Sequence, residues 1–288
     1  MLIFMDSMEF RAKLQCRTIW CQAVLCAAIA VAAACVNPAS RAARSASSAG
    51  FDAIQLPGQP FSHTAFFRDP GNSGPLWVFI DGDGSPWIRG GTEIAADPTP
   101  HRPLALGLAR ATPGAVLYLG RPCYFAARRD PACSPELWTG GRYGEAVVDS
   151  LAAAVNGFAA AHGKTRIVLV GYSGGGALAA LLAPRVPQTT ALITIAANLD
   201  TDRWTLLHGY TALSDSLNPA LLPPPPPQVV QIHLVGDKDL NVPPAAMTGY
   251  FQHAPAATVW HYDGFDHSCC WESAWPRILT RLQAALPP

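Results

Sequence analysis

Short apolar runs alternate with helical patterns along most of the chain. Eight runs bounded by turn residues have the length of strands, at residues 51–56, 62–67, 75–80, 115–120, 166–170, 191–196, 229–235 and 257–262. Apolar residues at helical spacing follow most of them, at 101–112, the later part of 135–163, 175–184, 244–252 and 271–286. Strands that alternate with helices indicate βαβ units and a mostly parallel sheet with helices on both faces. Functional side chains are therefore expected at the carboxyl ends of the strands.

The length of 288 residues, half of them hydrophobic, suits one large domain, which we place at 51–288. The longest connection, 197–228, ends in the polyproline stretch LLPPPPPQ. We expect this connection to form a short cap over the edge of the site.

The N-terminal segment has the character of an export signal. Basic residues precede an apolar run, 18–35, that ends in small residues, which is typical of a secretory signal peptide over 1–35. An uncleaved membrane anchor is the alternative. The end of the run, VAAAC, is similar to the lipobox of bacterial lipoproteins, which would make Cys35 the site of lipid attachment. Residues 36–50 are interpreted as a flexible tether. The protein is thus expected to be periplasmic, membrane-anchored or secreted.

The remaining cysteines fit an oxidising compartment. Four of them, Cys123, Cys133, Cys269 and Cys270, lie beyond the signal, and no CxxC metal spacing occurs. Neighbouring cysteines rarely bond each other, because one peptide unit strains the geometry. We expect a Cys123–Cys133 bond, with a link from either residue to the 269/270 pair as the alternative.

Charge narrows the class of partner. The formal net charge is zero, and beyond residue 50 the chain holds 15 Lys and Arg against 18 Asp and Glu. This slightly acidic body argues against nucleic acid as a partner.

The segment RIVLVGYSGGGALAALLA places a serine between glycines at the junction of a predicted strand and helix. Gly-Tyr-Ser-Gly-Gly fits the G-x-S-x-G nucleophile elbow, in which a sharp turn raises the serine above the sheet edge. The N–H groups that follow open a helix, whose dipole favours negative charge. Ser173 is the candidate nucleophile.

A serine nucleophile needs a base and an orienting acid, which follow it in the chain order Ser, Asp or Glu, His. The segment GFDHS leaves the last predicted strand and offers His267 as the base. Asp237 and Asp239 leave the strand before it, and Asp200 follows the strand at 191–196. All three aspartates are candidates for the acid.

The segments GYSGGG, GDKDLNVP and GFDHS together resemble the α/β-hydrolase superfamily, and DGDGSPW and RPC resemble its exported or lipoprotein bacterial members. The resemblance covers about 75–286 and implies an eight-stranded, mostly parallel sheet and a Ser-His-Asp hydrolase. In the superfamily pattern the acid is the third residue after the glycine, with Val-Pro three and four positions beyond it. This spacing selects Asp239, which leaves Asp237 as a turn residue.

The loop after the strand at 75–80 is expected to form part of the oxyanion hole. Many superfamily members have His-Gly there, whereas this chain has Asp81-Gly82-Asp83-Gly84. We expect the N–H groups of Asp83 and Gly174 to bind the oxyanion. Two carboxylates beside a developing negative charge require neutralisation, so we expect Arg121 to pair with Asp81 or Asp83 and to hold the loop rigid.

These features predict a serine hydrolase that acts on an extracytoplasmic small-molecule acyl ester, with no metal or organic cofactor. The alternatives are an acyltransferase or peptidase with the same residues, and an envelope protein that only binds a ligand. The oligomeric state is not predicted. Several side chains are candidates for the substrate pocket, namely Trp87, Trp138, Tyr172, Trp204, His208 and Phe265.

Overall fold

The computed structural model describes residues 37–71, 74–125 and 131–287. Eight strands form one sheet in the order β1-β2-β6-β3-β7-β8-β9-β10. Their bounds are β1 Asp52–Pro57, β2 Ser62–Arg68, β3 Leu76–Ile80, β6 Val116–Leu119, β7 Ile167–Tyr172, β8 Thr189–Ile195, β9 Val230–Gly236 and β10 Thr258–Tyr262. β2 is antiparallel to both of its neighbours, and every other pair is parallel. The eight strands and the mostly parallel sheet agree with the sequence-based prediction.

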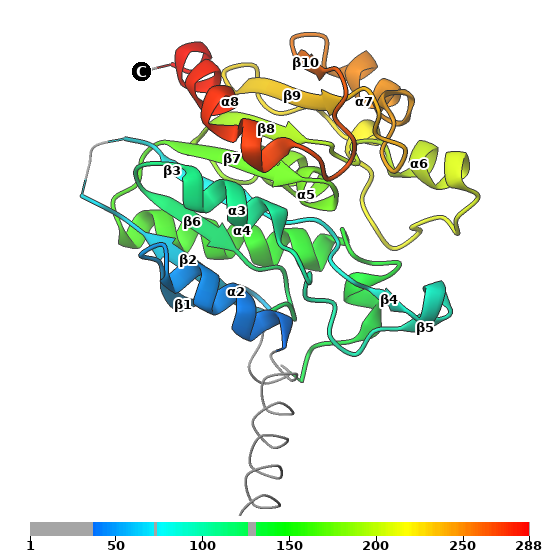
Figure 1. Ribbon diagram of the computed structural model, residues 1–288, viewed down its shortest axis with the longest axis horizontal. Helices are drawn as coiled ribbons and strands as arrows, with labels where there is room; N and C mark the ends of the chain where they lie inside the picture. The colour runs from blue at the N-terminus through cyan, green and yellow to red at the C-terminus, as the bar shows by residue number, and fades with distance from the viewer. Residues whose placement is uncertain (1–36, 72–73, 126–130, 288) are drawn as a thin grey trace, which may run out of the picture.

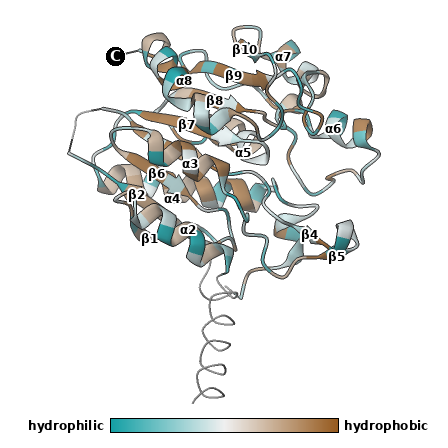
Figure 2. Ribbon diagram, viewed as in Figure 1, coloured by the Kyte–Doolittle hydropathy of each residue, from teal (hydrophilic) through white to brown (hydrophobic). Residues whose placement is uncertain are grey.

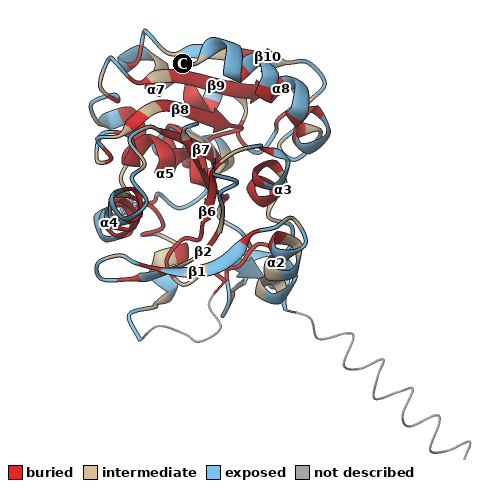
Figure 3. Ribbon diagram, turned by 90° about the vertical axis from the view of Figure 1, so that its left-hand side faces the viewer, coloured by how far each residue is buried: buried red, intermediate tan, exposed pale blue. Residues whose placement is uncertain are grey.

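Helices cover both faces of this sheet, so its central strands are apolar on both sides (Figure 3). The helices are α2 Pro38–Ser47, α3 Leu104–Ala111, α4 Glu145–Ala161, α5 Gly174–Leu182, α6 Thr201–His208, α7 Thr248–His253 and α8 Trp271–Ala285. Alternate residues of β3 show the two layers: Leu76, Val78 and Ile80 pack in the core with α4 and α5, whereas Trp77 and Phe79 pack with α2, α3 and α8. Burial on both faces explains why the strand appears in the sequence as a continuous apolar run.

The expectation of a flexible tether over residues 36–50 is wrong for its described part. Residues Pro38–Ser47 form helix α2 at the side of the sheet (Figure 1). The side chain of Asn37 caps this helix by accepting from the N–H of Ser40 at 2.7 Å, and Ala42 and Ala46 are buried. The small alanines allow close packing of a segment whose other residues are polar. The predicted signal peptide and Cys35 lie outside the described residues.

Further elements in two of the loops were absent from the prediction. The loop after β3 contains a short hairpin of β4 Trp87–Ile88 and β5 Glu93–Ile94. The predicted cap, 197–228, contains α6, which Asp200 caps, and a 3-10 turn at Pro219–Leu221. Within the described residues, no helix is both long enough and apolar enough to cross a membrane.

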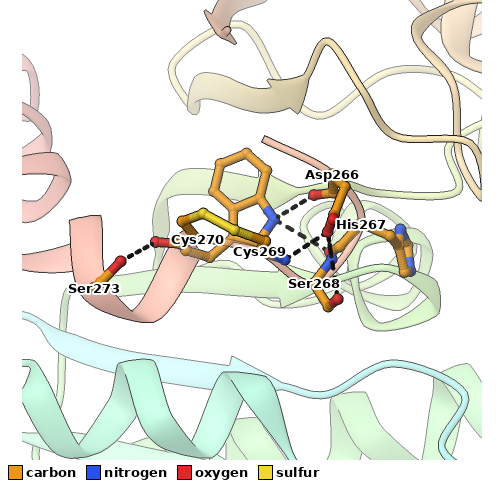
Figure 4. The surroundings of a disulfide bond; sticks show 7 residues. Asp266, His267, Ser268, Cys269, Cys270 and Ser273 are labelled. Atoms are coloured by element: carbon orange, nitrogen blue, oxygen red, sulfur yellow. Dashed lines mark hydrogen bonds between the residues drawn. A yellow bond between two sulfur atoms is a disulfide. The ribbon is translucent and has the colours of Figure 1, made fainter. Parts of the chain in front are cut away.

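The disulfides agree with the prediction at one place and differ at the other. Cys123 and Cys133 are joined, as expected, with an S–S distance of 2.07 Å. Cys269 and Cys270 are joined to each other, so both links from Cys123 or Cys133 to this pair are wrong (Figure 4). The peptide unit between Cys269 and Cys270 is cis, and their two Cα atoms lie 3.2 Å apart.

Candidate active site

Ser173 occupies the sharp turn between β7 and α5 that the sequence predicts. Its φ and ψ are 54° and −124°, and its N–H donates to the carbonyl of Ile195 at the end of β8. The flanking glycines are required by close packing. A Cβ atom at Gly171 would lie 2.2 Å from the carbonyl oxygen of Gly175, and one at Gly175 would lie 2.3 Å from that of Ile80. The turn therefore excludes side chains on both sides of the serine.

Three side chains, from the segments that follow β7, β9 and β10, form a continuous hydrogen-bonded chain. Nε2 of His267 lies 3.0 Å from the hydroxyl oxygen of Ser173, and Nδ1 of His267 lies 2.8 Å from Oδ2 of Asp239. The side chain of Asp239 is fully buried, and that of His267 is 21% exposed. With Nδ1 donating to the carboxylate, Nε2 is left as the acceptor toward the serine hydroxyl.

The turn after β9 explains why Asp239 and not Asp237 meets His267. Oδ1 of Asp239 accepts from the N–H groups of Asn241 and Val242, each at 2.8 Å, which fixes the carboxylate with Oδ2 toward His267. Asp237 instead pairs with His261 on the surface at 2.7 Å. The spacing taken from the superfamily pattern thus selects the aspartate that the structure places beside His267.

Asp200, the other candidate for the acid, holds the cap segment together. Its Oδ1 accepts from the N–H of Arg203 at 3.2 Å and from the side-chain amide of Asn218 at 3.1 Å. These bonds cap α6 and tie it to the rest of the cap segment, which leaves Asp200 without a contact to His267.

A tight turn of residues 266–270 holds the backbone of His267 (Figure 4). Oδ1 of Asp266 accepts from the N–H groups of Ser268 and Cys269 at 2.8 and 2.6 Å. The carbonyl of His267 accepts from the Tyr172 hydroxyl at 3.0 Å and from the Trp271 indole at 3.2 Å. Tyr172 comes directly before the serine, so this bond couples the positions of Ser173 and His267.

The loop after β3 lies against the serine. A Cβ atom at Gly82 would be 3.1 Å from that of Ser173. The N–H of Gly82 donates to Oδ1 of Asp81, whereas no hydrogen bond described for this part of the chain engages the N–H of Asp83 or of Gly174. Gly174 follows Ser173 directly and Asp83 lies in the loop against it, so both predicted oxyanion donors belong to segments next to the serine.

A nearly buried ion cluster anchors this loop. The carboxylate of Asp83 accepts from Nη1 of Arg121 at 2.6 Å, from Nη1 of Arg142 at 2.8 Å and from the Tyr143 hydroxyl at 2.8 and 2.9 Å. Burial alone raises the pKa of Asp83, but the two guanidinium groups outweigh it and hold the pKa well below its ordinary value. Of the two expected partners of Arg121, the structure selects Asp83.

Asp81 has a different environment. Its carboxylate accepts from the N–H groups of Gly82 and Ala105 and from the Tyr118 hydroxyl, at 2.9 to 3.1 Å, and it lies at the N-terminus of α3. Burial raises the pKa of Asp81 to about 6, and these hydrogen bonds only partly offset that effect. Asp81 thus links the loop to α3 and β6 without a counter-charge.

Ser173 and His267 line a cavity of about 1070 Å³, whereas Asp239 lies buried behind His267. Of the expected pocket residues, Trp87, Tyr172 and Trp204 line it. The other three do not: Trp138 is buried and donates to the carbonyl of Ala95, Phe265 packs against Trp271, and His208 contacts the carbonyl of Asn241. Among the described residues, no group of three or more His, Cys, Asp or Glu could hold a metal ion.

Arg142 and Tyr143 are site residues that the sequence analysis missed. They lie in a loop, about 60 positions after Asp83 in the chain, and no motif marks them. Asn198 was also missed, although it comes only three residues after the end of β8 at Ile195. It lines the cavity at 3% exposure, and its N–H donates to the carbonyl of Ser173 at 3.2 Å. Its place at the carboxyl end of a central strand was the available signal.

Among known proteins, the chain is similar to solved structures only. No protein-family profile matches the chain, and no curated protein matches its sequence. A membrane phospholipase A, a bacterial virulence factor, is 17% identical and matches 93% of this chain and 98% of its own, with a TM-score of 0.56. An esterase from Pyrobaculum calidifontis is 15% identical over 86% of this chain and 91% of its own, with a TM-score of 0.56. A serine hydrolase without a lid from Xanthomonas campestris is 16% identical over 83% and 96%, with a TM-score of 0.51.

Proposed function

We propose that this chain, which has the α/β-hydrolase fold, is a serine hydrolase that cleaves acyl esters through Ser173, His267 and Asp239. The observation that carries the proposal is the hydrogen-bonded chain of 3.0 and 2.8 Å, whose serine and histidine line a cavity together with Asp83. The structural neighbours, which include an esterase and a phospholipase, support the same class of reaction.

Each group has a role in the proposed reaction. The Ser173 hydroxyl attacks the carbonyl carbon while Nε2 of His267 takes its proton, and the buried Asp239 stabilises the imidazolium that forms. The oxygen that gains negative charge is held by the N–H groups of Asp83 and Gly174. His267 then returns the proton to the leaving alkoxide, which leaves an acyl-enzyme. Water activated by the same histidine releases the acid and restores the serine.

The ion cluster has an electrostatic role in this scheme. A free carboxylate at Asp83 would oppose the negative charge that develops on the carbonyl oxygen. Arg121 and Arg142 neutralise it within 2.8 Å, so the loop can offer the N–H of Asp83 without the repulsion of its side chain. Rigidity of the loop also lowers the cost of orienting that N–H in the transition state.

The proposed site of action is outside the cytoplasm, on a small-molecule acyl substrate. The N-terminal sequence supports export, with lipid attachment at Cys35 as one route to the membrane. The Cys123–Cys133 bond is in accord with an oxidising compartment. Detection of intact Met1 on a cytosolic protein by mass spectrometry would contradict this part of the proposal.

The test of the proposed chemistry is turnover of short activated esters by matched serine variants. Ser173→Ala is expected to abolish turnover while its melting temperature stays near that of the wild type, because the hydroxyl contributes little packing. Ser62→Ala, at an exposed position of β2, serves as the control and keeps full activity. Turnover retained in Ser173→Ala would refute the assignment of Ser173 as the nucleophile. A folded wild-type protein without turnover would favour a protein that only binds its ligand.

A further inference from the structure

Exposed apolar side chains are concentrated around the mouth of the cavity. Among the described residues, eight large hydrophobic side chains are exposed, and seven of them belong to segments that line the cavity or adjoin its lining. Six of these we term the docking face: Trp87, Ile88, Ile94, Leu206, Leu207 and Tyr210. The seventh, Leu240, precedes the lining residue Asn241. Single exposed apolar residues are ordinary, but a gathered set marks an interaction surface.

The docking face has two halves from distant parts of the chain. One half is the β4–β5 hairpin, and the other is α6 with Tyr210, and both lie at the same end of the molecule (Figure 1). Figure 2 shows hydrophobic residues on the hairpin and at the end of α6. Trp87 and Tyr210 line the cavity itself, so the apolar surface is continuous with the pocket.

The pattern of α6 is the reverse of that of an ordinary surface helix. It buries the polar Thr201 and Thr205, whereas Leu206 and Leu207 are 80% and 49% exposed. A surface helix normally directs its apolar residues inward. The exposed leucines of α6 therefore contribute nothing to the core, and their placement calls for an apolar environment outside the protein.

We propose that the docking face seats the mouth of the cavity on a lipid surface, so that the enzyme takes its acyl ester from a bilayer. The assignment of lipid as the substrate class rests on the proposed function, whereas the docking itself does not. Trp87 and Tyr210 at the rim suit this role, because their rings are amphipathic and favour the boundary between acyl chains and headgroups.

The position of the face selects a lipid surface over a protein partner. A protein that covered an apolar rim on both sides of the mouth would close the cavity to substrate. A lipid surface covers the same rim and delivers an acyl chain directly to it. Exposed apolar side chains that enter the acyl boundary of a bilayer gain the free energy of leaving water.

The first described helix, α2, also lies near the mouth of the cavity. Nη2 of Arg41, on α2, lies 3.3 Å from Nδ1 of His101. The neighbours of His101 on both sides, Pro100 and Arg102, line the cavity. Helix α2, the first described element, thus contacts the segment at the cavity rim, and it begins three residues after Cys35, the predicted site of lipid attachment. A chain attached to a membrane there would hold the mouth close to the bilayer.

Vesicle binding without hydrolysis tests the docking alone. Both hydrophobic core clusters lie entirely at or after Ala39, so a chain that starts at Asn37 keeps the described core. In this chain, with Ser173→Ala, we expect co-sedimentation with phosphatidylcholine vesicles. The triple variant Ile88→Ser, Leu206→Ser and Leu207→Ser should lower the partition coefficient about tenfold or more, since each change removes apolar surface that enters the bilayer.

A matched control distinguishes the docking face from general hydrophobicity. Leu221 is 72% exposed but does not line the cavity or adjoin its lining, so Leu221→Ser should leave vesicle binding within about twofold of the parent chain. Absence of co-sedimentation in the parent chain overturns the proposal, as does an equal loss in Leu221→Ser. A dimer in analytical ultracentrifugation that the triple variant abolishes also overturns it, in favour of a second copy on this face.

Turnover by the full-length chain tests the substrate class. Two substrates are compared, p-nitrophenyl acetate in solution and a long-chain p-nitrophenyl ester held in phosphatidylcholine vesicles. The triple variant should lose about tenfold on the vesicle ester and keep its rate on the acetate, because its three positions do not line the cavity. Equal rates of wild type and triple variant on both substrates overturn the lipid assignment. A wild type that cleaves neither ester overturns the proposed function, while vesicle binding still reports on the docking.

Discussion

Asp83→Asn is the substitution whose energetic effect follows most directly from the structure. The Asp83 carboxylate accepts from Arg121, Arg142 and Tyr143 at 2.6 to 2.9 Å. Arg121 and Arg142 are 2% and 7% exposed, and Asp83 is the only carboxylate paired with them in the described part of the chain. The asparagine keeps the shape and one acceptor oxygen, but it leaves two buried positive charges without a counter-charge.

The expected cost follows from that imbalance. Removal of one partner from a buried ion pair costs about 3–5 kcal/mol, because the remaining charge is desolvated and unpaired. Here part of the cost is relieved. Arg121 still donates to the carbonyl of Arg142 at 2.8 Å, and Arg142 to that of Thr139 at 2.6 Å. We therefore expect a loss of about 3 kcal/mol from a free energy of unfolding of about 5–15 kcal/mol.

Removal of a positive charge from the cluster, instead of the negative one, gives an internal comparison. Arg121→Met leaves Asp83 with one guanidinium and the Tyr143 hydroxyl, so no buried charge stays uncompensated. Its expected cost is about 2 kcal/mol, the value of a charged hydrogen bond. The triple change of Asp83 to Leu with both arginines to Met should be less destabilising than Asp83→Asn, since it removes all three charges together.

Urea unfolding at pH 7, followed by tryptophan fluorescence, measures these differences. Asp52→Asn, at an exposed position of β1, is the control and should stay within about 0.5 kcal/mol of the wild type. The reasoning is refuted if Asp83→Asn also stays within that range, or if Arg121→Met costs more than Asp83→Asn. In either case the cluster does not depend on charge balance.

Two further predictions concern single carboxylates. Burial raises the pKa of Asp81 to about 6 from 3.8, so the native state holds a proton that the unfolded chain loses between about pH 4 and 6. The contribution of Asp81 to stability therefore falls by about 3 kcal/mol as the pH rises through that window. Asp81→Asn should remove this pH dependence from the free energy of unfolding measured in urea. Parallel dependences in wild type and variant would contradict the prediction. Asp239→Asn should lower turnover about ten-thousandfold, whereas Asp237→Asn and Asp200→Asn keep most of it, because only Asp239 contacts His267. Kinetic measurements on a short ester test this prediction. A collapse of turnover in Asp237→Asn or Asp200→Asn would assign the role of the acid to that residue instead.

The sheet could be predicted because its central strands are buried on both faces and therefore appear as apolar runs. The three side chains of the site could be predicted because each lies next to its strand in the sequence: Ser173 after β7, Asp239 after β9 and His267 after β10. Parallel strands bring these ends to one edge, so local motifs sufficed.

The elements that were missed depend on tertiary contacts. Helix α2 is rich in Ala, Ser and Arg, and only the packing of Ala42 and Ala46 on the domain distinguishes it from a tether. Arg142 and Tyr143 reach Asp83 across about 60 residues, and nothing in their own segment indicates a charge partner.

Labelling of the purified full-length protein with a fluorophosphonate, followed by peptide mapping, tests the central proposal most directly. The reagent modifies a serine only where a base activates it and an oxyanion hole holds the phosphoryl oxygen. The account predicts one modified peptide, with the label on Ser173, and loss of labelling in Ser173→Ala and in His267→Ala. A folded protein without label, or a label on a different serine that persists in Ser173→Ala, would contradict it.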